Sequence, residues 1–431
     1  MKLGSLFDGS GGFPLAGSLN EMAPAWACEV EPYPIRVTKE RFPGMKHLGS
    51  VTEVNGAEIE PVDVITFGSP CQDLSIAGKQ KGIHDGVRSS LFFQVVRIIK
   101  EMRENGRAIG RANEHIRPRF AVWENVPGAY SSNGGRDFQA VLQALCEIAD
   151  PAVSIPFPQK GKWANAGCIV GDGYSIAWRT YDAQYWPRTT QRRKRIYLIA
   201  DFASERAGEI LFERESVPGH SEPGEKAGKG IAVDAERSAG GSDQAGGVIG
   251  AFMGGQGAKA RSIAYCDDGT TPTLKASNSG SNQAPDVVYQ NTGIGWWNES
   301  KTAETLRTPC GGDSTKANLV VYSIEGRKWI VRRLMPLECC RLQGFPDGWG
   351  DVSDIKELSD EEHAFLLSVR NTHEKLNGKK KKWYTKERMI RWLNKLHTDS
   401  AEYKMWGNGI ALPCASDVMR RIAEAMKKEE K

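Results

Sequence analysis

The chain opens with Leu3-Gly4-Ser5-Leu6-Phe7-Asp8-Gly9-Ser10-Gly11-Gly12-Phe13. Residues 3–7 predict a strand, the glycines predict a turn, and a helix is expected to follow through Leu19. This order is typical of the nucleotide-binding start of a doubly wound α/β fold, because glycine lets the backbone approach a ligand closely. Such turns also occur without ligands. Pro14 stands where a dinucleotide fingerprint has its third glycine, which argues against NAD.

A second strand, residues 25–28, ends at Glu29. In nucleotide-binding folds, an acid about 20 residues beyond the glycine turn typically binds ribose hydroxyls. A solvated surface acid is the other interpretation of Glu29.

A third strand, residues 62–67, is rich in β-branched and apolar side chains and is stopped by Gly68 and Pro70. Cys71 therefore lies on a loop at the carboxyl end of a strand, where open α/β sheets keep their ligand crevices. Alone, a single cysteine is more often a small buried hydrophobic residue. Its significance depends on the rest of the chain.

Two further strands bring charged residues to the same region. Residues 120–123 predict a strand that ends at Glu124, and the basic run 191–195 precedes a strand at 196–200. The cations stand at the amino end of their strand. To share an edge of the sheet with Cys71 and Glu124, this strand must run antiparallel to the others, and we predict that it does. A solvated face or a non-specific phosphate contact is the other interpretation of the run.

The rest of the chain is interpreted from composition and periodicity. Residues 271–289 and 303–322 form an internal repeat that resembles paired β-hairpins with polar tips. The remaining expected elements are helices at 91–99, 138–148, 332–343 and 415–426, a loop insertion at 151–175, a flexible linker at 216–247, and a helical insertion at 351–398 that is dispensable for chemistry.

Composition narrows the class of protein. The chain has 431 residues, 40% hydrophobic and 26% charged, with a net charge of +4, so a nucleic-acid partner requires a local basic patch. Nine scattered cysteines, without zinc-ligand spacing, indicate neither a disulfide framework nor a metal. Since no signal peptide or membrane span is evident, we expect a cytoplasmic monomer without metal or membrane partners.

Taken together and in order, these stretches resemble the DNA cytosine-5 methyltransferases of bacteria and phages. The resemblance covers nearly the whole chain. Its motifs are Phe7 to Phe13, Ser69-Pro70-Cys71-Gln72, Glu124-Asn125-Val126, Gln191 to Arg195, Arg333-Leu334 with Pro336, Glu338, Arg341 and Gly344-Phe345-Pro346, and Gly407-Asn408. The fold implied is a Rossmann-like methyltransferase sheet with an antiparallel strand and a smaller target-recognition domain.

The resemblance also implies the chemistry. The Cys71 thiolate would add to carbon 6 of cytosine, since a thiolate is strongly nucleophilic and leaves again. Glu124 would stabilise the resulting enamine, and Arg193 and Arg195 would hold the base oxygen and favour the thiolate. The cofactor implied is S-adenosylmethionine, bound by Phe7, Gly9, Gly11, Gly12, Glu29, Val30, Val51, Pro70, Leu91, Asn408 and Ile410.

Double-stranded DNA is the expected partner, with the target cytosine flipped out of the helix. A transfer-RNA methyltransferase and a non-catalytic nucleic-acid binder are the alternatives.

The chain departs from the family pattern at Gly49-Ser50-Val51, where an acid often faces adenine, at Arg188-Thr189-Thr190 and at Gly409. The expected domains are a catalytic domain at 1–200, target recognition at 201–350, a helical insertion at 351–404, and a return to the catalytic domain at 405–431.

Overall fold

The computed structural model describes most of residues 1–212 and 334–429. Side chains are described for residues 1–69, 91–159, 161–186, 189, 191–212, 334–380 and 382–429, and only the backbone for five strands between residues 247 and 332. Among the described residues, no helix is long and apolar enough to cross a membrane.

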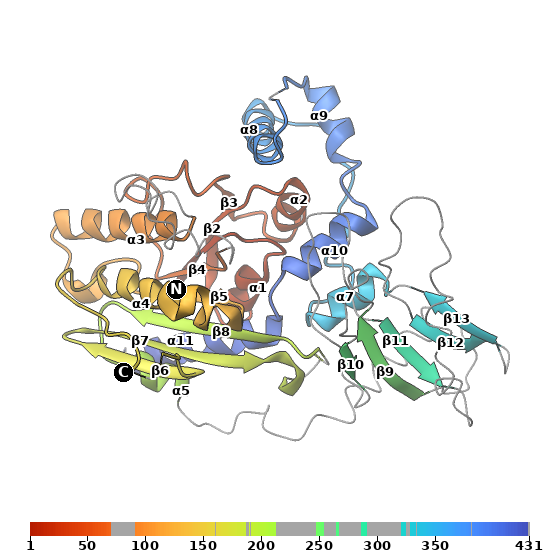
Figure 1. Ribbon diagram of the computed structural model, residues 1–431. Coiled ribbons are helices and arrows are strands. Elements are labelled where there is room, and N and C mark those ends of the chain that lie inside the picture. Colours follow the sequence, from red (N-terminus) through yellow and green to blue (C-terminus); the bar gives the residue numbers. More distant parts are fainter. Residues whose placement is uncertain are drawn as a thin grey trace.

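Eight strands form one mixed sheet in the order β3-β2-β1-β4-β5-β8-β7-β6 (Figure 1). Strands β1 to β5 pair in parallel, whereas β8 pairs antiparallel with β5 and with β7. The strands are β1 Lys2–Leu6, β2 Ala23–Cys28, β3 Lys46–His47, β4 Val64–Phe67, β5 Phe120–Asn125, β6 Ala166–Gly171, β7 Tyr174–Asp182 and β8 Lys194–Asp201. The expected doubly wound sheet and its antiparallel strand are confirmed.

Helices cover both faces of this sheet. Successive residues of β5 alternate between two apolar cores, with Val122 in one and Trp123 in the other. The first core includes α1 and α11, and the second includes α3 and α4. The helices are α1 Gly12–Ser18, α2 Pro32–Arg41, α3 Leu91–Ala108, α4 Arg136–Cys146, α5 Ala207–Phe212, α7 Pro336–Leu342, α8 Asp360–Leu376, α9 Lys386–Leu393, α10 Asp399–Asn408 and α11 Leu412–Glu429.

The interpretation of 151–175 as a loop insertion is wrong for its second half. Residues 166–171 form β6, and β7 begins at Tyr174. Strand β6 lies at the edge of the sheet and is half exposed, so its glycines and polar neighbours hide the usual pattern of a buried strand.

Two helix boundaries also differ from the prediction. Arg332 ends strand β13, and helix α7 begins only at Pro336, where proline fits the first turn because it needs no amide partner there. Met405 to Asn408 form the last turn of α10, which the sequence did not predict as a helix. Thr398 caps the start of α10, and its side chain accepts a hydrogen bond from the Ala401 amide at 3.2 Å.

A second sheet has the order β10-β9-β11-β12-β13. Its strands are β9 Gly247–Met253, β10 Ala264–Cys266, β11 Asp286–Gln290, β12 Val320–Ile324 and β13 Lys328–Arg332. The ends of the two sequence repeats pair in parallel, Val287 with Val320 and Val288 with Val321. Equivalent positions of the repeat therefore lie side by side, while the first halves of both repeats and most of the linker at 216–247 lie outside the described residues.

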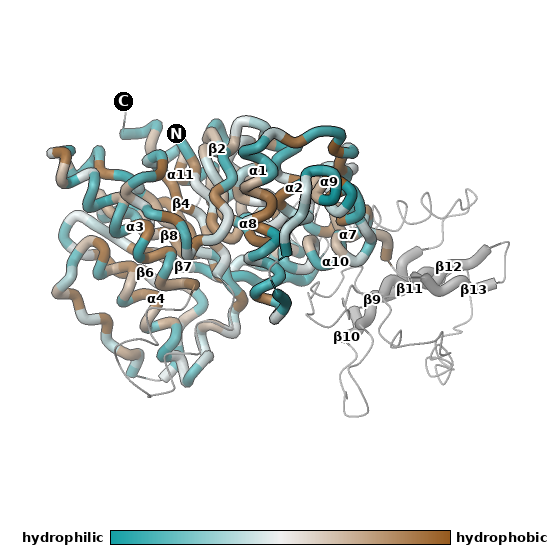
Figure 2. Tube along the Cα trace, turned by 90° about the horizontal axis from the view of Figure 1, so that it is seen from above, coloured by the Kyte–Doolittle hydropathy of each residue, from teal (hydrophilic) through white to brown (hydrophobic). Residues whose placement is uncertain are grey.

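The helical insertion has a small core of its own. Leu366 and Leu367 of α8 pack with Met389 and Leu393 of α9. Ser359 and Glu362 cap α8 reciprocally through two hydrogen bonds of 3.1 and 3.2 Å. Figure 2, seen from above, shows α8 beside α2, and the two helices are in contact. The insertion is thus helical as predicted, and its helix α8 packs against α2.

Candidate active site

A cavity of about 1980 Å³ lies at the carboxyl ends of the parallel strands. It is lined by Phe7 after β1, Glu29 after β2, Ser69 after β4 and Glu124 near the end of β5. Arg195 belongs to β8, whose antiparallel direction brings its amino end to the same edge. Since pockets for one small molecule are typically about 300–1,000 Å³, this cavity has room for two ligands.

Glu29 is fixed by the backbone around it. Its carboxylate accepts hydrogen bonds from the amides of Gly9 at 2.8 Å, Val30 at 2.7 Å and Glu31 at 2.9 Å. Burial raises the pKa of Glu29, and these three bonds oppose the shift. An ionised carboxylate can accept about four hydrogen bonds, so Glu29 keeps capacity for a ligand hydroxyl.

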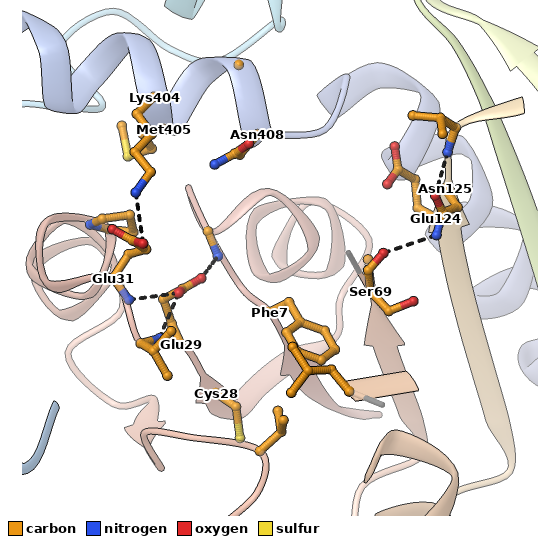
Figure 3. Close-up of a pocket in the computed structure, with 18 of the residues that line it drawn as sticks. Phe7, Cys28, Glu29, Glu31, Ser69, Glu124, Asn125, Lys404, Met405 and Asn408 are labelled. Carbon is orange, nitrogen blue, oxygen red and sulfur yellow. Dashed lines mark hydrogen bonds and ion pairs between the residues drawn. The ribbon is translucent and has the colours of Figure 1, made fainter. Parts of the chain in front are cut away.

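The turn after β1 supports this arrangement. Phe7 and Gly9 both have positive φ, 57° and 56°, a conformation that is strained for phenylalanine and easy for glycine. The Asp8 amide donates to the Cys28 carbonyl oxygen at 3.0 Å, which ties the turn to the end of β2. The Gly9 amide is thereby held against Glu29, and Phe7 lies between Glu29 and Glu124 in Figure 3.

The predicted cofactor residues divide into two groups. The structure brings seven of them to the cavity: Phe7, Gly9, Glu29, Val30, Val51, Leu91 and Asn408. Gly11, Gly12 and Ile410, which were also predicted, do not line the cavity. Gly11 packs against Thr38 and Phe42, and Gly12 packs against Ile410. Pro70 lies outside the described residues. The group that lines the cavity offers apolar walls and a carboxylate with capacity to accept from a hydroxyl, which fits the nucleoside of S-adenosylmethionine.

Glu124 and Arg195 form a buried ion pair at the other end of the cavity. Arg195 Nε lies 3.0 Å from Glu124 Oε1, and the two side chains are only 12% and 11% exposed. Burial raises the pKa of Glu124, while the charges of Arg195 and Arg193 oppose the shift. Folding therefore moves this carboxyl towards the protonated form.

The start of the cysteine motif is tied to Glu124. Asn125 Nδ2 donates to the Ser69 carbonyl oxygen at 3.0 Å, and Trp123 Nε1 donates to Ser69 Oγ at 3.2 Å. A Cβ on Gly68 would stand 3.4 Å from Glu124 Oε2. Cys71 itself lies outside the described residues, so its role remains a prediction, but the chain enters its motif beside Glu124.

Arg193 has a different environment from Arg195. Its buried guanidinium donates to the carbonyl oxygens of Gly407, at 3.4 Å, and Gly409. Burial and the nearby charge of Arg195 lower its pKa. These bonds join the start of β8 to the end of α10. The predicted contact between Arg193 and the target base remains a prediction.

Sequence reasoning missed one wall of the cavity. This wall combines residues from α2, α8 and α10: Glu31, Tyr33, Pro34, Ser368, Asn371, Thr372, Lys375, Leu376, Lys404 and Met405. A polar stripe at helical spacing is visible in α8, but a sequence does not reveal whether such a stripe faces solvent or a cavity. Within the described residues, no cluster of histidine, cysteine and acidic side chains could hold a metal ion.

Known proteins share both the sequence pattern and the fold. An adenine methyltransferase, named DNA N-6-adenine-methyltransferase, from Escherichia phage P1 is 28% identical over 95% of this chain and 59% of its own length. Type II methyltransferase M2.BsuMI of Bacillus subtilis is 31% identical over 52% of this chain and 46% of its own length. This chain thus spans about half the length of these relatives.

Comparison of structures agrees on the fold. The crystal structure of S. pombe Dnmt2 methyltransferase superposes over 100% of both chains with a TM-score of 0.53 and 13% identity. The family model for C-5 cytosine-specific DNA methylase matches residues 1–149 and 170–361. The chain therefore belongs to the family of C-5 cytosine-specific DNA methylases.

Proposed function

We propose that this protein transfers a methyl group from S-adenosylmethionine to carbon 5 of cytosine in double-stranded DNA. The observation that carries the proposal is the single cavity with two different ends. Glu29, which suits a ribose, lies at one end, and the Glu124–Arg195 pair, beside the start of the cysteine motif, lies at the other. Two ligands that must react need such a shared space.

At the cofactor end, Glu29 would accept a hydrogen bond from the ribose, with Phe7, Val30, Val51 and Leu91 as apolar walls. S-adenosylmethionine, when bound, supplies an electrophilic methyl group on a sulfonium. The buried carboxylate of Glu29 is preorganised by three amides, so binding a ribose costs it little reorganisation.

At the base end, the Cys71 thiolate would add to carbon 6 of cytosine and make carbon 5 nucleophilic. Glu124 with its raised pKa would donate its proton to ring nitrogen 3 as the ring gains electrons. Arg195 would orient Glu124 and bind the base oxygen. After methyl transfer, a base removes the carbon 5 proton, the carbon–sulfur bond breaks, and Cys71 leaves as the thiolate.

The target base must leave the DNA stack to reach this cavity. We propose that residues 201–350 read the flanking bases, that 1–200 and 405–431 form the catalytic domain, and that 351–404 are an insertion. Basic side chains around the cavity, such as Arg192 and Lys194, support binding of a polyanion.

Adenine is the competing target, because the printed name of the phage P1 relative describes an N-6-adenine enzyme. Methylation of an exocyclic amine needs no thiol addition to the ring. The match to the cytosine-specific family model and the Cys71 motif favour cytosine in this chain.

The test is methylation of host DNA by the expressed protein, read by mass spectrometry of the nucleosides. We expect 5-methylcytosine from the wild type and none from Cys71→Ala. DNA with 5-fluorocytosine at the target should trap a denaturation-resistant adduct with the wild type, because fluorine blocks the last elimination. N6-methyladenine alone, or an adduct with Cys71→Ala, would overturn the proposal, and methylation of transfer RNA but not DNA would favour the RNA alternative.

A further inference from the structure

Helix α8 turns a polar stripe towards the cavity. Ser368, Asn371, Thr372 and Lys375 are spaced three, four and seven residues apart, and all four line the cavity. Residues at this spacing share one face of a helix. The stripe is therefore the cavity face of α8, whereas Leu366 and Leu367 point into the core of the insertion.

Two contacts fix this face against the sheet. In the first half of α8, a Phe365 ring carbon lies 3.8 Å from the point where a Cβ on Gly49 would stand. Near its end, His373 Nε2 lies 3.4 Å from Glu31 Oε2, and Glu31 also pairs with Lys404 at 2.9 Å. The helix rises about 12 Å between these two contacts, which is comparable to the length of a nucleoside.

Both contacts lie at the cofactor end of the cavity. Gly49 immediately precedes Ser50 and Val51, which line the cavity, and Glu31 is two residues from Glu29. Figure 3 shows Glu29 and Glu31 together, with Lys404 reaching Glu31, and Glu124 across the cavity. The α8 stripe therefore faces the ligand that Glu29 binds, not the one that Glu124 binds.

The stripe offers what a purine nucleoside requires. Asn371 Oδ1 accepts a hydrogen bond from the Lys382 amide at 3.1 Å, which assigns its oxygen and leaves Nδ2 as the donor. Thr372 adds a hydroxyl, and Leu376, which is 69% exposed, adds an apolar surface at the cavity edge. Purine ring nitrogens accept hydrogen bonds, and the purine faces are apolar.

We propose that α8 is a wall of the cofactor site and that Asn371 and Thr372 bind the adenosine end of S-adenosylmethionine. The inference rests on the proposed function and deepens it, because it gives the insertion a direct part in cofactor binding. It replaces the expectation that residues 351–398 are dispensable for the reaction.

Calorimetric titration tests this without relying on turnover. S-adenosylhomocysteine and 5′-methylthioadenosine, which lacks the amino-acid group, are titrated into the wild type, Asn371→Ala and Thr372→Trp. Loss of one hydrogen bond should raise the Kd of Asn371→Ala about five- to tenfold for both ligands. Thr372→Trp should raise it further by filling the cavity wall. Ala364→Trp is the matched control, because Ala364 is exposed on α8 and does not line the cavity.

The outcomes separate the two proposals. If the wild type binds neither ligand, the proposed function fails. If the wild type binds both, and Asn371→Ala and Thr372→Trp bind them equally well while melting like the wild type, α8 is not part of the cofactor site. Hydrogen exchange gives an independent reading, since S-adenosylhomocysteine should slow exchange of the amides in α8. Unchanged exchange there, with slowed exchange around Glu29, would also overturn the inference.

Discussion

Replacing Glu124 with glutamine removes the proton of its neutral form and the negative charge of its ionised form while keeping the shape of the side chain. If Glu124 donates its proton to the base, Glu124→Gln should lower the single-turnover rate of methyl transfer by about 10²–10⁴, the usual contribution of a general acid. That range corresponds to about 3–5.5 kcal/mol in the activation free energy.

The stability effect should be smaller than the catalytic effect. The amide oxygen keeps a partial negative charge near Arg195 Nε, which lies 3.0 Å from Glu124 Oε1, but the buried guanidinium loses the ionised counter-ion. Breaking a buried pair outright typically costs about 3–5 kcal/mol, so we expect the free energy of unfolding to fall by less than this. Glu101→Gln is the control, because Arg97 and Glu101 form a similar pair, 2.8 Å long, on half-exposed positions of α3.

The pH dependence gives a second test of Glu124. Because folding raises its pKa, the folded chain holds this proton more tightly than the unfolded chain. The stabilising contribution is therefore fully present below the unfolded value of about 4.5 and is lost as the pH rises through the folded pKa. Activity should fall over the same interval, and Glu124→Gln should lack this inflection. A Gln variant that keeps the wild-type single-turnover rate and pH profile would refute the role of Glu124.

Three more perturbations test other parts of the molecule. Glu29→Ala should weaken S-adenosylhomocysteine binding by about 1.5–3 kcal/mol, measured by calorimetry, and unchanged affinity would contradict the ribose assignment. Replacing Lys379 to Lys382 with glutamine should lower the affinity for target and non-target DNA about equally and flatten the salt dependence of the Kd. Unchanged binding at low salt would indicate that these lysines form a solvated turn without DNA contacts. Exchanging residues 201–331 for the segment of a related enzyme should change the methylated sequence but not the methylated base, and bisulfite sequencing that returned the original sequence would place recognition elsewhere.

Local sequence signals were sufficient for the centre of the sheet. Residues 62–67 and 120–123 are mostly apolar because central parallel strands are buried on both faces. Gly68 follows β4 directly, whereas β5 runs two residues beyond its predicted end, through Glu124 to Asn125. The antiparallel direction of β8 followed from one condition, that Arg195 share an edge with Glu124, and the structure confirms it. The carboxylates at strand ends were therefore predictable without coordinates.

The missed elements depend on contacts between distant residues. Strand β6 is an edge strand whose half-exposed side chains give no buried run, so only its pairing with β7 defines it. The polar stripe of α8 carries the same pattern whether it faces water or a cavity. What decides is the contact of Phe365 with Gly49 and of His373 with Glu31, more than 300 residues apart in both cases.

The packing of α1 against α11 has a consequence for biosynthesis. Helix α11 packs against α1 on one face of the sheet, and the guanidinium of Arg193 reaches the carbonyl oxygens of Gly407 and Gly409. On a ribosome, residues 1–200 emerge long before these partners exist. Until α11 appears, Phe13, Val122 and other apolar side chains of that core lack their cover, so the nascent sheet is a candidate for chaperone binding. The sheet can therefore complete its packing on this face only after the ribosome has added residues 412–429.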